Sequence, residues 1–130
     1  MAITLTEITP LLEVFDLPAS TAFYRDVLGF EVTDQYAPGR HLYWAMLRHG
    51  PAMLMLNAKY EDEHRPAKPP QTGHTDVILY LGCPNVDEVH AELHAKGYPV
   101  KEPETTFYGM RQLHVVDPDG FELCFQHRAI

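Results

Sequence analysis

Residues 109–126 read GMRQLHVVDPDGFELCFQ, and the DPDG at residues 117–120 predicts a tight turn between two strands. Proline sets φ at the first corner of such a turn, and glycine accepts the positive φ that closes a short hairpin loop. A type I turn followed by a glycine bulge pairs Asp117 with Phe121. The same register places His114 opposite Cys124.

This register divides the hairpin into two faces, because paired residues of an antiparallel ladder point to the same side. One face is apolar and should pack against helices; it consists of Leu113, Val115, Phe121, Leu123 and Phe125. The other is more polar and should line a ligand site; it consists of Gln112, His114, Val116, Glu122, Cys124 and Gln126.

Outward from the hairpin, the sequence predicts the same succession of elements twice. In the second half we expect a strand at 76–81, a helix capped by Asn85 and ended by Gly97, and strands near 99–100, 111–116 and 121–126. In the first half we expect a strand at 5–15, a helix at 18–28, and strands at 31–34, 41–47 and 52–57. The junctions LGFEV at 28–32 and KGYPV at 96–100 are alike. The pattern therefore predicts an α+β fold built from a repeated βαβββ module.

The length of 130 residues predicts a single domain spanning residues 1–130. The first module should cover about 5–57 and the second about 74–127. Residues 58–73, rich in proline and charge and without periodicity, should connect them as a linker.

Composition argues against several classes of partner. The net charge is −8, from 18 acidic and 10 basic residues, which disfavours nucleic acid and anionic membranes because both need clustered Lys and Arg. The N-terminus lacks the pattern of a secretory signal, and no apolar stretch approaches the ~20 residues of a membrane span. Two cysteines are too few for a disulfide framework. These features predict a cytoplasmic protein.

Two segments carry a resemblance to a known family. They are TPLLEVFDLPASTAFYRDVLGFE at 9–31 and HVVDPDGFEL at 114–123, one in each half. The chain resembles the vicinal oxygen chelate superfamily, which includes glyoxalase I, extradiol dioxygenases, and fosfomycin and bleomycin resistance proteins. The resemblance implies two βαβββ modules whose sheets form a curved, cup-shaped mixed sheet, with helices on the convex side and a ligand inside the cup.

Enzymes of this superfamily hold a divalent metal with His, Gln or Glu from four strands. By resemblance these four positions fall on Thr9, Met55, Asp76 or Ile78, and Cys124. Thioether and hydroxyl groups bind hard divalent cations poorly. Glu122 is a carboxylate two residues before the last position. We therefore expect no metal and no cofactor.

The residues expected to line the cup combine aromatic, sulfur and polar side chains. A flat or apolar cation suits such a lining. The predicted set is Thr9, Glu13, Trp44, Met53, Met55, Asn57, Tyr108, Met110, Gln112, His114, Glu122 and Cys124. An alternative interpretation is that many of these residues simply fill the cup.

The resemblance is nearest to bleomycin resistance proteins, which bind a drug without altering it. It implies a metal-free protein that binds a small molecule such as a cationic drug, and a homodimer that exchanges its N-terminal strand near Pro10. The alternative is a divalent-metal-dependent lyase or dioxygenase that uses His74, Asp76, His114, and Glu122 or Cys124. A sensor or carrier of a metabolite is a third possibility.

The His114 and Cys124 pair has two interpretations of its own. It could supply a nucleophile with its base, or two ligands of a soft metal such as zinc. Otherwise both residues pack on the wall of a pocket, as buried free cysteines usually do. His90 and His94, four residues apart, are expected on an exposed helix face.

Overall fold

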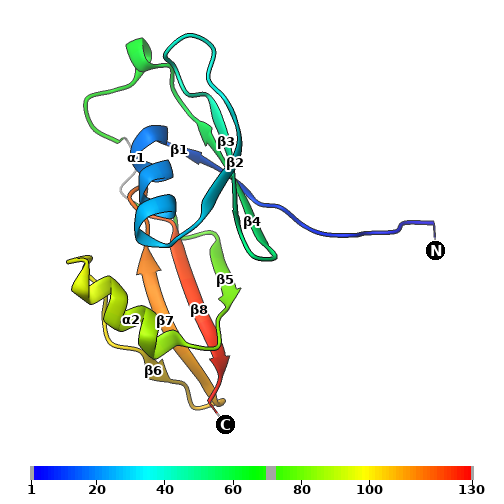
Figure 1. Cartoon of the computed structure of the whole chain (residues 1–130), viewed down its shortest axis with the longest axis vertical. Helices are drawn as coiled ribbons and strands as arrows, with labels where there is room; N and C mark the ends of the chain where they lie inside the picture. Colours follow the sequence, from blue (N-terminus) through cyan, green and yellow to red (C-terminus); the bar gives the residue numbers. More distant parts are fainter. Residues whose placement is uncertain (1, 70–72, 130) are drawn as a thin grey trace. The chain divides into compact units, whose positions relative to one another are not determined.

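The computed structural model describes residues 2–69 and 73–129, and within them the chain forms two compact units (Figure 1). Unit 1 comprises Met1–Arg25 and Gly29–Arg65, and unit 2 comprises Asp26–Leu28 and Pro66–Ile130. Each unit has one four-stranded mixed sheet and one α-helix packed on it. This confirms the α+β class.

Unit 1 follows the order strand, helix, three strands. Its elements are β1 (Leu11–Val14), α1 (Leu17–Ala22), a π-helical turn η1 (Phe23–Val27), β2 (Glu31–Tyr36), β3 (Trp44–His49) and β4 (Ala52–Ala58), followed by a short 3₁₀ helix η2 (Asp62–His64). The strand order is β1-β4-β3-β2, with β1 parallel to β4 and the other neighbours antiparallel.

Local chemistry explains where the first helix begins and where its π turn stops. The carboxylate of Asp16 accepts a hydrogen bond from the Ala19 amide at 3.1 Å, and Pro18 occupies the first turn, where its missing N–H costs nothing. Gly29 follows η1 with a φ of 80°, a conformation that glycine adopts readily. The helix at 18–28 is therefore confirmed, with its last part wound as a π turn.

Unit 2 repeats this order. Its elements are β5 (Ile78–Gly82), α2 (Val86–Ala95), β6 (Glu104–Thr105), β7 (Met110–Val116) and β8 (Glu122–Arg128), with strand order β5-β8-β7-β6. The first strand again runs parallel to the last. Gly97 follows α2 with a φ of 76°, in the same relation to its helix as Gly29. The repeated βαβββ module is thus confirmed.

The β7–β8 hairpin has the predicted register. His114 pairs with Cys124, and Val116 pairs with Glu122. Gly120 has a φ of 92°, and the Asp117 amide donates to the Phe121 carbonyl at 2.9 Å. On the apolar face, Leu113, Val115 and Leu123 are buried on the side where α2 packs.

Several element boundaries differ from the prediction. The strand predicted at 5–15 is confirmed only at Leu11–Val14, and the rest of the prediction is wrong because residues 2–10 lie in neither helix nor strand. Strand 76–81 begins only at Ile78, and the strand near 99–100 is replaced by β6. Asn85 precedes α2, but its side chain donates to Glu88 at 3.1 Å instead of capping the helix. Among the described residues, no helix has the length and apolar character to cross a membrane.

Candidate functional site

The sheet of unit 2 presents a polar face on the side away from its buried core. Strand pairing arranges this unit 2 face as three rows that run across β5, β8 and β7. The rows are Ile78–Glu122–Val116, Tyr80–Cys124–His114, and Gly82–Gln126–Gln112, and the third row continues to Glu104 on β6. Partners in a row point to the same side of the sheet. Four predicted site residues are in these rows: Gln112, His114, Glu122 and Cys124. Met110, two residues before Gln112 on β7, is a fifth on the same side, and Tyr108 hydrogen-bonds to Gln112.

The imidazole of His114 is directed at a carboxylate instead of at the thiol expected to be its partner. Its Nδ1 lies 3.0 Å from Oε1 of Glu122, with side chains 45% and 36% exposed. The two residues are diagonal neighbours in the ladder, close enough for long side chains to meet. Glu122 is thus the orienting group that the sequence did not reveal for His114.

Cys124, in the centre of the middle row, is fully buried. Burial raises the pKa of the Cys124 thiol, and the nearby Glu122 carboxylate adds to this effect. Both causes disfavour the thiolate, which is the form that attacks electrophiles and binds metals. The arrangement therefore supports the packing interpretation of this cysteine over a nucleophile or a zinc ligand.

Two tyrosines flank the centre of the unit 2 face. Tyr80 pairs with Cys124 across the ladder, and the pKa of its hydroxyl is raised, chiefly by the electrostatic effect of Cys124 and further by burial, Tyr108 and Glu122. The amide of Gln112 donates to the Tyr108 hydroxyl at 3.3 Å and to Oε1 of Gln126 at 3.0 Å. Because Gln112 is buried, these bonds fix the amide orientation and position Tyr108.

The sheet of unit 1 has a corresponding face, rich in sulfur. One row pairs Leu11, Met55, Met46 and Asp34, and the next pairs Glu13, Asn57, Trp44 and Tyr36. Met53, two residues before Met55, is on the same side. Five predicted residues therefore share this face, whereas Thr9 precedes β1. Unbranched thioethers adapt to ligands of varied shape.

Within the described residues, the alternative metal set does not converge as a whole: only its members His114 and Glu122 are in contact. Nε2 of His74 lies 2.7 Å from Oδ2 of Asp119, and its ring stacks on buried Phe121 at 3.7 Å. Asp76 is exposed and precedes β5, whereas His114 pairs with Glu122. The positions that the resemblance assigns to metal ligands hold the Thr9 hydroxyl, the Met55 thioether, Asp76 or Ile78, and the buried Cys124 thiol with its raised pKa. Because at most one of these four is a carboxylate, the donor set does not fit a hard divalent cation.

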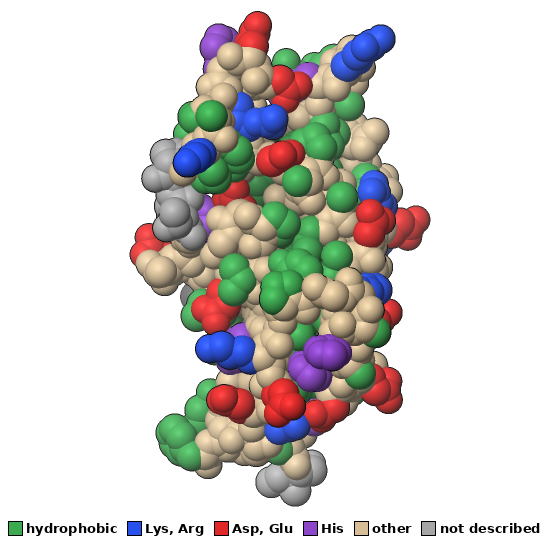
Figure 2. All heavy atoms as spheres, turned by 90° about the vertical axis from the view of Figure 1, so that its left-hand side faces the viewer, with side chains coloured by type: hydrophobic (Ala, Val, Ile, Leu, Met, Phe, Trp, Pro, Cys, Tyr) green, Lys and Arg blue, Asp and Glu red, His purple; other side chains and the backbone are tan. Residues whose placement is uncertain are grey.

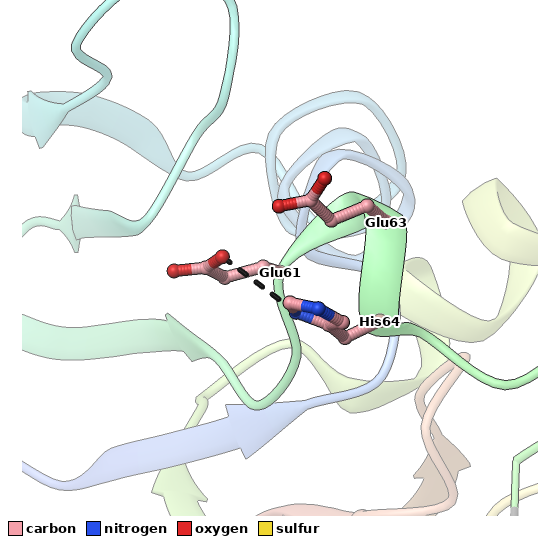
Figure 3. A group of neighbouring side chains, drawn as sticks. All are labelled: Glu61, Glu63 and His64. Atoms are coloured by element: carbon pink, nitrogen blue, oxygen red, sulfur yellow. Dashed lines mark ion pairs between the residues drawn. The ribbon is translucent and has the colours of Figure 1, made fainter.

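Metal-ligand atoms converge elsewhere in the described part of the chain. Glu61, Glu63 and His64, around the short helix η2, offer three ligand atoms within 4.8 Å of one another (Figure 3). All three side chains are exposed, and the His64 imidazole lies 3.7 Å from Glu61. An exposed acidic cluster of this kind is common on protein surfaces, and here no further group points to a bound ion.

A cavity of about 640 Å³ lies on the helix side of unit 1. It is lined by residues of α1, β2 and the adjoining loops, among them Thr21, Arg25, Val32, Gln35 and Leu42. It contains none of the predicted site residues, and the buried Thr21 hydroxyl beside it is closed off from solvent. Most of the predicted site residues lie instead on the sheet face of each unit.

The acidic residues do not gather on the side of the molecule shown in Figure 2. There, acidic side chains (red) are scattered among basic and hydrophobic ones. The net charge of −8 therefore does not by itself identify a binding surface on that side. In the rows that cross β5, β8 and β7 on the unit 2 face, the negative charge is that of the Glu122 carboxylate.

Sequence reasoning missed Tyr80 as a member of the unit 2 face. Its side chain is exposed on β5, in the row of Cys124 and His114. Alternation along β5 could have identified it, since it is two residues after Ile78. The predicted hairpin register set Gln126 opposite Gln112, which is the signal for the amide–amide hydrogen bond observed between them.

Comparisons with known proteins agree with this fold. The model of the Glyoxalase/Bleomycin resistance protein/Dioxygenase superfamily matches residues 7–125. No curated protein matches the sequence.

Three solved structures illustrate the range of similar proteins. The antibiotic-binding protein TnmS3 from Streptomyces sp. CB03234 is 28% identical, with 98% of each chain covered and a TM-score of 0.73. A bleomycin-binding protein complexed with bleomycin is 25% identical, over 95% of this chain and 99% of that chain, with a TM-score of 0.70. A lactoylglutathione lyase from Agrobacterium tumefaciens is 26% identical, over 94% and 93%, with a TM-score of 0.67.

Proposed function

Because the chain belongs to the glyoxalase/bleomycin resistance protein/dioxygenase superfamily, we propose that it is a metal-free protein that binds a small molecule on its sheet faces. The observation that carries this proposal is the composition of the two faces. The unit 1 face presents thioethers and the Trp44 ring, and the unit 2 face presents tyrosine rings and amides beside the Glu122–His114 pair. Such a surface binds through stacking and apolar contact.

The similar proteins support binding over catalysis, although the superfamily includes both. Two of the three are an antibiotic-binding protein and a bleomycin-binding protein, and the third is a lyase. A cationic drug fits the carboxylate on the unit 2 face, and a role in antibiotic resistance would follow from sequestering it. A cytoplasmic location accords with the two free cysteines.

We also propose a homodimer formed through the N-terminal arm, residues 2–8. The arm precedes β1 as an extended segment (Figure 1). Its apolar residues Ile3, Leu5 and Ile8 are 71%, 85% and 91% exposed. Exchange of such an arm between two copies would bury these side chains. Burial stabilises the dimer by roughly 25 cal/mol for each Å² of apolar surface removed from water.

A thermal-shift panel with metal analysis tests the proposed function. We expect bleomycin, or another planar cation of the panel, to raise the melting temperature with increasing ligand concentration, because a ligand that binds only the folded state stabilises it by mass action. A concentration of about 100 Kd should add about 2.7 kcal/mol. We expect a chelator to leave the melting temperature unchanged.

The opposite outcome would favour the lyase or dioxygenase alternative. Stoichiometric zinc, nickel, manganese or iron in the purified protein, removed by a chelator together with thermal stability, would contradict the metal-free proposal. Stabilisation by metals but by none of the organic cations would contradict it as well.

A further inference from the structure

We propose that Glu122 is the residue that selects a positively charged ligand on the unit 2 face, and that His114 is a positioning residue that holds its carboxylate. This inference rests on the proposed function, because it takes the unit 2 face to be a binding surface. It adds the residue that sets ligand charge and the chemical class that this residue favours.

Glu122 is the acidic side chain in the rows that cross β5, β8 and β7. In the rows that cross β5, β8 and β7, the other side chains are aliphatic, phenolic, thiol, imidazole or amide groups. Cys124 does not compete for a cation, because burial raises the pKa of its thiol and keeps it neutral. Within the paired rows, the other acid is Glu104, which ends the third row on β6, two strands and four residues away. That separation is about 16 Å by strand spacing, well beyond the Debye length of about 8 Å in physiological salt. Asp76, two residues before Ile78, precedes β5 and lies outside these rows.

The neighbours of Glu122 in its own row are aliphatic and exposed. Ile78, 42% exposed, lies on one side and Val116, 53% exposed, on the other. A cation that reaches the carboxylate therefore has apolar surface on both sides. Tyr80, in the next row, presents an exposed ring that can attract the same cation. The row favours an amphipathic cation, in which an ammonium or pyridinium-type charge belongs to an apolar or planar body.

The Glu122 carboxylate can accept further hydrogen bonds while it is in contact with His114. The contact involves Oε1, and a carboxylate has two oxygens with about four acceptor positions. A hydrogen bond from Nδ1 restricts the rotamers of Glu122, so less conformational freedom is lost when a ligand binds. His114 acts here through Glu122 and need not touch the ligand.

The experiment compares a permanently charged probe with a neutral probe of the same shape. N-methylacridinium serves as the cation, and acridine, at a pH where it is uncharged, serves as the neutral probe. Fluorescence titration of the full chain gives Kd for each, and the ratio of the two values measures charge selectivity. We expect the wild-type protein to bind the cation more tightly, and Glu122→Gln to reduce the ratio by about tenfold with little change in Kd for acridine.

Glu104→Gln is the matched control, because it makes the same change of charge on the same face. We expect it to change the ratio by less than about twofold, since the charge it removes is screened. His114→Ala should weaken cation binding by about threefold. His114→Asn should restore it, because the asparagine amide can donate from nearly the position of Nδ1.

Each other outcome overturns a defined part of the proposal. If neither probe binds the wild-type protein, both the proposed function and this inference fail for planar ligands. If both probes bind and Glu122→Gln leaves the ratio unchanged, the charge-selecting role fails while the binding function stands. If His114→Ala strengthens cation binding, His114 competes with the ligand, and its positioning role is wrong.

Discussion

Cys124 lies between Tyr80 and His114 in the middle row of the unit 2 face, at the position where the resemblance to metal-binding relatives would place a carboxylate. Its thiol is fully buried and its pKa is raised, whereas Cys83 is only half-buried, with its thiol 3.2 Å from the side-chain oxygen of Asn85. We therefore predict that a disulfide reagent such as DTNB reacts with one thiol of the native protein and with two in denaturant.

Two single substitutions test which of the two cysteines reacts with DTNB in the native protein. Cys83→Ser should abolish the native reaction, and Cys124→Ser should leave it unchanged. A fast native reaction in Cys83→Ser would mean that Cys124 is accessible and reactive. Its interpretation as a packing residue would then be wrong.

At the scale of elements, the β7–β8 hairpin depends on one buried carboxylate. Oδ1 of Asp117 accepts hydrogen bonds from the amides of Asp119 at 2.9 Å and Phe121 at 2.8 Å. Asp117 itself is 4% exposed, so its loss leaves these amides without their acceptor in a buried turn. We predict that Asp117→Ala lowers the free energy of unfolding by about 3 kcal/mol, measured by urea denaturation.

Asp117→Asn is the control for this prediction, because the asparagine carbonyl can still accept from both amides. It should lose about half as much stability as the alanine variant or less. Equal losses in the two variants would show that the charge of Asp117, and not its acceptor geometry, stabilises the turn.

The same hairpin shows which features could be predicted from sequence. The DPDG turn combines a proline of fixed φ with a glycine at positive φ, and these two residues determine the type of turn. Because the turn sets the register of both strands, the pairing of His114 with Cys124 could be predicted from local chemistry. Strand pairing then placed five predicted site residues on the unit 2 face. Turn chemistry is informative because it acts within a few residues.

Features that depend on distant partners could not be predicted. β6 has only two residues and exists because Glu104 and Thr105 meet β7, so no periodicity marks it. His74 belongs to the alternative metal set, but its imidazole contacts Asp119, 45 residues away in the sequence. The strand register makes both Cys124 and Glu122 neighbours of His114, and it does not determine which of them the imidazole contacts. In the structure the imidazole contacts Glu122.

At the scale of the whole molecule, each unit presents a different kind of surface. The unit 1 face is dominated by methionines with Trp44, and the unit 2 face by tyrosines, amides and Glu122. The two βαβββ repeats therefore share one strand order but differ in the side chains of their rows. Each face by itself therefore favours a different part of a ligand, the unit 1 face an apolar part and the unit 2 face a charged one.

The N-terminal arm provides the test of how two copies assemble. We predict that the full chain sediments as a dimer and that deletion of residues 2–8 produces a monomer, measured by analytical ultracentrifugation. The physical reason is that Ile3, Leu5 and Ile8 are exposed in the single chain and β1 begins only at Leu11, so the arm can gain backbone and apolar contacts from a partner. Replacing Thr4 and Thr6 with Ser keeps these apolar residues and should preserve the dimer. A full chain that sediments as a monomer, or a deletion variant that remains dimeric, would show that the arm does not join two copies.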